Sequence, residues 1–210
     1  MSSETLLFSL PAGNDVLRGS FSGTGNSRGI VLLSEASAEP RETSRVFLTR
    51  FHDAGLSTFS VNLLTPREES FSGIHDNVPL LCGRLRDFLD HLKRYLAREN
   101  AARQDFMFYA ADAASPAALR VSAERDGRAI VCHGGLIDRA GTFYLNSLNS
   151  PLLFIADRND AALLVMAERA FRKISGVKEM ALIDPSDPGA LRIAADRMTD
   201  WFLRNPPEVT

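Results

Sequence analysis

The stretch that decides the fold of this protein is DFMFYAADAASPAALR, residues 105–120. It begins with a short apolar run, passes through a turn of small residues centred on Asp112, and continues as the start of a helix. This order predicts a buried strand, a tight turn and a helix. Asp is one of the few residues besides Gly that tolerate a positive φ angle. We therefore expect Asp112 to occupy the tightest point of the turn.

Length and composition predict a single domain. The chain has 210 residues, of which 45% are hydrophobic. A chain of this size can bury one continuous core without dividing into separate units. We therefore expect residues 1–210 to form one domain.

Charge and hydropathy exclude several classes of partner. The formal net charge is -2, and the Lys and Arg residues are scattered rather than clustered, so the sequence favours neither nucleic acid nor an anionic membrane. No apolar run approaches the roughly 20 residues of a membrane span, and the first residues lack the pattern of a secretion signal. Cys82 and Cys132 are isolated and form no metal motif, which is typical of a reducing compartment. The sequence predicts a cytoplasmic protein without a cofactor.

Strand and helix patterns alternate along the chain. The apolar runs 5–10 and 16–21 are separated by PAGND, which predicts an antiparallel hairpin. Further strands are predicted at 30–33, 56–61, 128–132, 151–155 and 178–183, and helices at 40–54, 76–100, 161–174 and from Asp187 onward. The alternation predicts an α/β fold: a mainly parallel sheet with helices on both faces and a hairpin at the N-terminal end.

Three details of this pattern can be checked against the structure. The segment 62–75, which contains TPREES, is interpreted as a loop. In the long helix 76–100 the apolar residues form one stripe, and Arg84 is predicted to lie largely off it. Ser115 with Pro116, and Asp187 with Pro188, are each interpreted as an N-cap followed by the first helical residue.

Ligands of parallel sheets bind beyond the carboxyl ends of the strands, and this rule selects the candidate site residues. Most residues at the predicted strand ends are acidic or amide. We expect the rim of the site to be formed by Glu35, Asn62, Asp112, Ala113, His133, Asp157, Asn159, Asp160 and Asp184.

The turn sequence YAADAASPAAL resembles the nucleophile elbow of small bacterial α/β-hydrolases of the dienelactone hydrolase-like group. Four further blocks are similar to segments of that group: GLSTFSVNLLTPREE, VPLLCGRLRDFLDHL, HGGLIDRAG and PGALRIAADRMTDWFLRN. Together these blocks cover most of the chain. The resemblance implies a three-layer α/β-hydrolase fold, but it identifies the fold better than an activity, because activity depends on site residues.

Carrying the family's Ser-His-acid triad onto this sequence shows departures at several positions. The elbow G-x-S-x-G falls on residues 110–114, so Asp112 replaces the nucleophilic serine. The acid falls on Asn159 or, with a shift of one residue, on Asp160. The histidine expected after the last strand has no match, because residues 183–187 read IDPSD. The His-Gly pair that usually precedes the oxyanion loop falls on Glu35 and Ala36, and a carboxylate there opposes developing negative charge.

Asp112 suggests one alternative chemistry. Some α/β-hydrolases form an ester on an aspartate at the elbow, and Asp112 fits that role. Hydrolysis of such an ester needs a base to activate water. His133 is the candidate base, although an isolated histidine at this position is more often a structural, hydrogen-bonded residue.

The acidic rim leaves two interpretations open. Glu35, Asp112, Asp157 and Asp184 could converge on a hard cation, which prefers oxygen ligands. Alternatively, Asp112, Asp184 and Asp187 cap the N-termini of the helices that follow them, and we favour this interpretation because no ligand spacing supports a metal.

The sequence therefore predicts a non-catalytic α/β-hydrolase homologue that binds a small-molecule ligand or a protein partner. The alternative hypothesis is an active hydrolase of esters, lactones or related small molecules that uses Asp112 in an atypical site.

Overall fold

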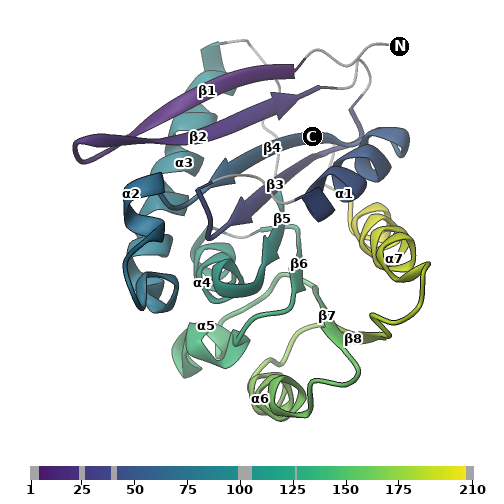
Figure 1. Ribbon diagram of the computed structural model, residues 1–210. Helices are drawn as coiled ribbons and strands as arrows, with labels where there is room; N and C mark the ends of the chain where they lie inside the picture. Colours follow the sequence, from purple (N-terminus) through teal and green to yellow (C-terminus); the bar gives the residue numbers. More distant parts are fainter. Residues whose placement is uncertain (1–4, 24–26, 39–41, 99–105, 126, 207–210) are drawn as a thin grey trace.

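The computed structural model describes residues 5–23, 27–38, 42–98, 106–125 and 127–206. Eight strands form one sheet in the order β1-β2-β4-β3-β5-β6-β7-β8 (Figure 1). The strands are β1 (Thr5–Ala12), β2 (Asp15–Ser22), β3 (Ile30–Glu35), β4 (Ser57–Asn62), β5 (Phe106–Ala111), β6 (Ala129–His133), β7 (Leu152–Asp157) and β8 (Lys178–Ile183). β1 and β2 pair antiparallel, and β2 pairs antiparallel with β4; every other pair is parallel. The predicted α/β fold with its N-terminal hairpin is confirmed.

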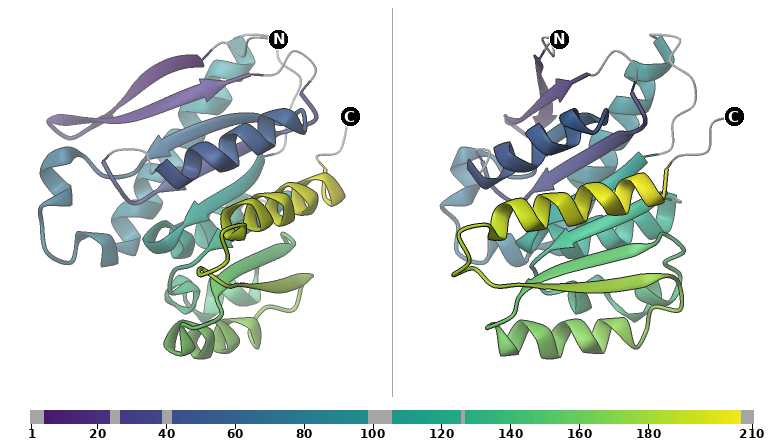
Figure 2. Two further views of the ribbon diagram at one scale, coloured as in Figure 1. Left: turned by 45° about the vertical axis from the view of Figure 1, so that its right-hand side comes forward. Right: turned by 90° about the vertical axis from the view of Figure 1, so that its right-hand side faces the viewer.

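Helices cover both faces of the sheet. One face carries α1 (Glu42–Asp53) and α7 (Ala190–Arg204), which lie side by side in Figure 2. The other face carries α3 (Val78–Arg98), α4 (Ser115–Arg125), α5 (Thr142–Asn146) and α6 (Ala161–Phe171). Each central strand is buried on both sides, which explains the continuous apolar runs in β3, β5, β6 and β7.

The C-terminal helix packs onto the sheet as its apolar face predicts. Trp201 is 3% exposed and Phe202 is fully buried. The ring of Phe202 meets Phe51 of α1 edge to face, with 5.5 Å between centroids. Such aromatic pairs add to the stabilisation from buried area, so α1 and α7 form one aromatic layer over this face.

Three local predictions are wrong. The predicted loop 62–75 contains the short helix α2 (Pro66–Glu69), which begins with a capping box between Thr65 and Glu68, and the 3₁₀ turn η1 (Ile74–Asp76). Ser115 is not an N-cap, because it already has helical φ and ψ angles and its hydroxyl donates to the carbonyl of Gly134 at 2.9 Å. The N-cap of α7 is Gly189 rather than Asp187, whose Oδ1 accepts from the Gly189 amide at 2.7 Å.

Arg84 is also misplaced by the sequence pattern, since it is buried instead of lying in solvent. Its guanidinium binds both carboxylate oxygens of Glu68 at 2.5 and 2.6 Å. It also donates to the carbonyl of Leu63 at 2.7 Å. Arg84 therefore ties the α2 segment and the end of β4 to α3.

In the part of the chain that the structure describes, no helix has both the length and the apolar character needed to cross a bilayer.

Candidate functional site

The elbow has the geometry that the sequence predicts. β5 ends at Ala111, the 3₁₀ turn η2 (Asp112–Ala114) follows, and α4 begins at Ser115. Asp112 has a φ angle of 47° and is the only residue other than Gly with a positive φ among the described residues. Its side chain is exposed at the carboxyl end of the sheet. A strained residue at a strand-to-helix turn is typical of a functional position.

Two glycines after β6 allow this turn to form. A Cβ atom on Gly135 would lie 1.9 Å from the carbonyl oxygen of Asp112, and a Cβ on Gly134 would lie 2.6 Å from its Oδ1. Both glycines also have positive φ angles, 73° at Gly134 and 85° at Gly135. The pair in HGGLIDRAG is therefore needed because the backbone after β6 passes directly against Asp112.

Glu35 and Asn62, at the ends of β3 and β4, face inward and are buried. The carboxylate of Glu35 accepts a hydrogen bond from the hydroxyl of Ser44 on α1. The amide of Asn62 donates to the hydroxyl of Ser37 at 3.3 Å. These contacts hold the loop after β3 in place, so neither residue is an open ligand on the rim.

The acids after β7 and β8 belong to local turns and caps. Asp160 is the N-cap of α6, because its Oδ1 accepts from the Leu163 amide at 2.9 Å. Asp157 accepts from the amide of Asn159 at 2.8 Å. Capping is thus observed at Asp160, whereas the N-cap of η2 is Ala111 and not Asp112.

Asp184 follows the last strand, where the α/β-hydrolases that the sequence resembles carry their histidine. Its carboxylate accepts hydrogen bonds from the hydroxyl and the amide of Ser186, at 2.6 and 3.0 Å. Arg158 lies 3.6 Å away. The hydrogen bonds from Ser186 lower the pKa of Asp184, with Arg158 as a smaller cause.

His133 ends β6 and is paired in register with Ala111, the residue before the elbow aspartate. Its Nδ1 lies 3.4 Å from the Tyr109 hydroxyl, and its ring meets Phe47 edge to face at 5.5 Å. The ring also lines a hollow of about 180 Å³ between the ends of β6, β7 and β8 and the start of α7, whose other residues are Ala156, Asp157, Ile183, Pro185, Ala190, Leu191 and Ala194. His133 is half-buried and is oriented by its neighbours.

A second hollow, of about 140 Å³, lies next to the elbow. It is lined by Ala113, the residue after Asp112, and by His75, Asp76, Val78, Pro116, Gly135, Leu136 and Arg139. Arg139 and Asp76 form an ion pair across it, and His75 Nδ1 lies 3.0 Å from the carbonyl of Ala36. The sequence analysis missed His75, Asp76 and Arg139 because they lie in segments without periodicity, far from the elbow along the chain.

A metal centre was the alternative use of the acidic rim. Within the described ranges, no group of three or more His, Cys, Asp or Glu side chains is placed to hold a metal ion. Glu35 is turned toward Ser44 and Asp184 toward Ser186, so these rim acids satisfy local donors.

The eight-stranded, mostly parallel sheet and the elbow after β5 define the α/β-hydrolase fold, and comparison with solved structures gives the same class. Dienelactone hydrolase from Anabaena variabilis superimposes with a TM-score of 0.84 and 25% identity, covering 97% of this chain and 99% of that chain. A dienelactone hydrolase-like promiscuous phosphotriesterase from metagenomic libraries matches in fold, with a TM-score of 0.78 and 12% identity over 98% of this chain and 100% of that one. The expected resemblance to dienelactone hydrolase-like structures is confirmed.

The curated relatives add a different name. Two Mycobacterium tuberculosis proteins, from strains CDC 1551 and H37Rv, are 29% identical to this chain over 185 residues and are provisionally named phosphoribosyl transferases. The match covers 84% of this chain but only 41% of each relative. No family model matches the sequence.

Proposed function

We propose that this protein is a non-catalytic α/β-hydrolase homologue that binds a small ligand at the elbow. The observation that carries the proposal is the pairing of an intact elbow with altered chemistry: Asp112 has the strained φ of 47°, while the loop after β8 contains no histidine. Ester hydrolysis by a serine triad requires a hydroxyl nucleophile and a histidine that takes its proton. Two hollows retain space for a ligand near the elbow: one is lined by Ala113, the residue after Asp112, and the other by His133, which pairs with Ala111 in the sheet.

Electrostatics supports the loss of acyl transfer. An oxyanion hole places hydrogen-bond donors where negative charge develops. In α/β-hydrolases one oxyanion donor is the amide of the residue after the nucleophile, which corresponds to Ala113, next to the exposed carboxylate of Asp112. A carboxylate there repels the developing charge instead of stabilising it.

Hydrolysis assays test the proposal directly. We expect the purified protein to hydrolyse p-nitrophenyl acetate and the lactone dihydrocoumarin no faster than buffer. Asp112→Ser should remain inactive as well, because an unassisted serine hydroxyl is a weak nucleophile. Ligand-observed NMR should show saturation transfer to dihydrocoumarin while the lactone stays closed, and Leu6→Trp, which lies far from the elbow in the N-terminal hairpin, should leave this transfer unchanged. If no saturation transfer to the lactone were observed, the proposed ligand binding would be wrong.

One observation favours a second candidate, an active hydrolase with Asp112 as nucleophile. His133 lies next to the elbow in the sheet register and lines a hollow together with Asp157, so a base is available near the site. In this mechanism Asp112 attacks the substrate carbon, the leaving group departs, and His133 then activates water to cleave the ester. Turnover lost in both Asp112→Asn and His133→Gln, with a covalent adduct on Asp112 by mass spectrometry, would establish this candidate instead.

Phosphoribosyl transfer is not part of the proposal. The chain matches 41% of the relatives that carry this name, so most of their length lies outside the match. The carboxyl ends of the strands here present Asp112, Asp157 and Asp184, which disfavour a polyanionic diphosphate sugar.

A further inference from the structure

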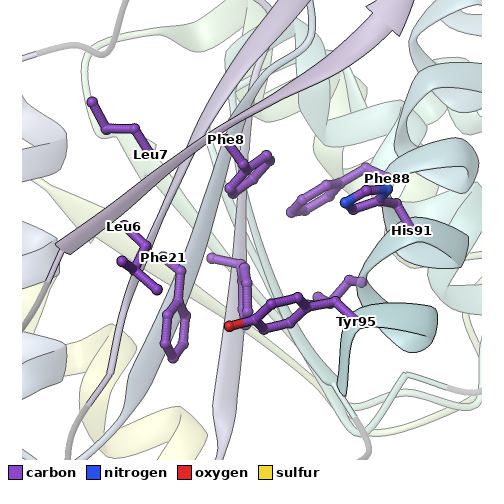
Figure 3. A pocket seen from close by; sticks show the side chains of 9 residues that line it. Leu6, Leu7, Phe8, Phe21, Phe88, His91 and Tyr95 are labelled. Carbon is purple, nitrogen blue, oxygen red and sulfur yellow. The ribbon is translucent and has the colours of Figure 1, made fainter. Parts of the chain in front are cut away.

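A separate pocket lies beneath the N-terminal hairpin, between β1, β2 and β4 on one side and α3 on the other (Figure 3). Its volume is about 240 Å³. It is lined by Leu6, Leu7, Phe8, Phe21, Phe59, Phe88, His91, Leu92 and Tyr95. None of these residues belongs to the elbow or to the two hollows beside it, so this pocket is a distinct feature of the fold.

The walls of the pocket are aromatic and held in place. Phe8 of β1 stacks on Phe88 of α3, with 5.6 Å between ring centroids. Phe21 of β2 stacks on Phe59 of β4 at 4.3 Å, and Tyr95 meets Phe59 edge to face at 6.4 Å. Phe59, Phe88 and Leu92 are buried. The pocket is therefore formed by packed rings on regular elements, and a ligand would enter it without reorganising a loop.

Two polar groups stand among these apolar walls. Figure 3 shows the Tyr95 hydroxyl and the His91 ring on the α3 side of the pocket. Neither side chain makes a hydrogen bond within the described part of the chain. The lining contains no Asp, Glu, Lys or Arg. This arrangement suits a neutral ligand with one hydrogen-bonding group, because a charged ligand would lose its hydration without gaining an opposite charge.

The volume sets the size of the ligand. An apolar cavity of about 150 Å³ in another protein holds benzene. A pocket of about 240 Å³ therefore accommodates a substituted ring of roughly ten non-hydrogen atoms. Aromatic walls favour an aromatic ligand, since rings gain from edge-to-face and offset-stacked contacts.

We propose that this pocket is a second binding site, specific for a small neutral aromatic molecule whose hydroxyl or carbonyl group hydrogen-bonds to Tyr95. The site is independent of the proposed function of the elbow. Leu6, which is 44% exposed and lies on the same face of β1 as Phe8, is on the open side and would cover the bound ring.

The test uses 4-ethylphenol as the probe and ethylbenzene as the matched probe without a hydroxyl. Titration followed by ¹H–¹⁵N NMR should give saturable shifts of the residues that line the pocket. Tyr95→Phe keeps the ring and removes the hydroxyl, and it should weaken 4-ethylphenol binding about fivefold, the effect of one neutral hydrogen bond. Ethylbenzene binding should not change in this variant. Leu6→Trp fills the open side and should weaken both probes at least about tenfold.

Asp112→Asn provides the control that separates this site from the elbow, and it should leave the binding of both probes unchanged. Failure of wild-type protein to bind 4-ethylphenol up to the solubility limit would overturn the proposal. If Asp112→Asn lost probe binding and Leu6→Trp retained it, the probe would bind at the elbow, and the proposed second site would be wrong. Dimerisation in sedimentation that Leu7→Lys abolishes, without probe binding, would assign this surface to a second copy of the chain instead.

Discussion

The partly buried ion pair between Arg84 and Glu68 gives a prediction about stability and pH. Glu68 of α2 accepts two hydrogen bonds from Arg84, whose side chain is 10% exposed, against 22% for Glu68. The hydrogen bonds from Arg84 are the main cause that lowers the pKa of Glu68 from 4.5 to about 2, against an opposing effect of desolvation. The pair therefore couples the folding of the α2 segment to the ionisation of one carboxyl group.

The size and sign of the effect follow from this shift. One pKa unit corresponds to about 1.4 kcal/mol, so a fall from 4.5 to about 2 corresponds to about 3 kcal/mol of unfolding free energy; allowing for partial solvent exposure we expect about 2 to 3 kcal/mol. The pKa is lower in the folded state, so the unfolded state binds the proton first. The stabilisation is full above about pH 4.5 and is lost as the pH falls toward about 2.

Urea titrations of wild type and Glu68→Gln from about pH 6 to about pH 2 measure this contribution. Other carboxyl groups titrate in the same pH range, so the informative quantity is the difference in unfolding free energy between wild type and Glu68→Gln. That difference should shrink by about 2 to 3 kcal/mol across the window. Arg84→Met removes the partner of Glu68. When Arg84→Met is added to both proteins, the difference in unfolding free energy between them should no longer depend on pH. A difference that stays constant with pH would show that the pair does not hold the charged form of Glu68, and would refute the reasoning.

Two further predictions concern packing. Trp201→Ala should destabilise by about 3 to 5 kcal/mol because the indole is 3% exposed, whereas Leu191→Ala should cost less than about 1 kcal/mol because Leu191, in the first turn of α7, is 41% exposed. Circular dichroism in denaturant measures both, and a small effect of Trp201→Ala would contradict the burial. Gly135→Ala should destabilise by at least about 2 kcal/mol because its Cβ would meet the Asp112 carbonyl at 1.9 Å, while Gly83→Ala, with open space around its Cβ, should be neutral or stabilising; equal melting temperatures for the two variants would show that the elbow relaxes easily.

Much of the architecture could be predicted from the sequence because the signals are local. A buried parallel strand needs a continuous apolar run, and an amphipathic helix needs apolar residues at steps of three and four. Both patterns are visible without knowing any partner. The small residues around Asp112 likewise indicate a tight turn, and its positive φ agrees with that interpretation.

The sequence alone also predicts an incomplete serine triad, because the absence of a histidine from the segment after the last strand can be seen directly. It could not show what the remaining polar residues do. Glu35 and Asn62 were expected on the rim, yet they are buried against Ser44 and Ser37, since their orientation depends on helices and loops that are distant in the chain. The capping expected of Asp187 failed because its carboxylate satisfies a loop amide before the helix begins.

Only the tertiary structure decided which distant side chains meet. Arg84 is polar and was expected to lie largely off the apolar stripe of α3, but it is buried, and its guanidinium pairs with Glu68 of α2. The pocket under the hairpin joins Phe8, Phe21, Phe59 and Tyr95 from four separate elements, none of which carries a local signal for a cavity. Local sequence determines which segments become strands and helices because periodicity acts within a few residues, whereas cavities and ion pairs depend on how whole elements pack, and that information is spread over the entire chain.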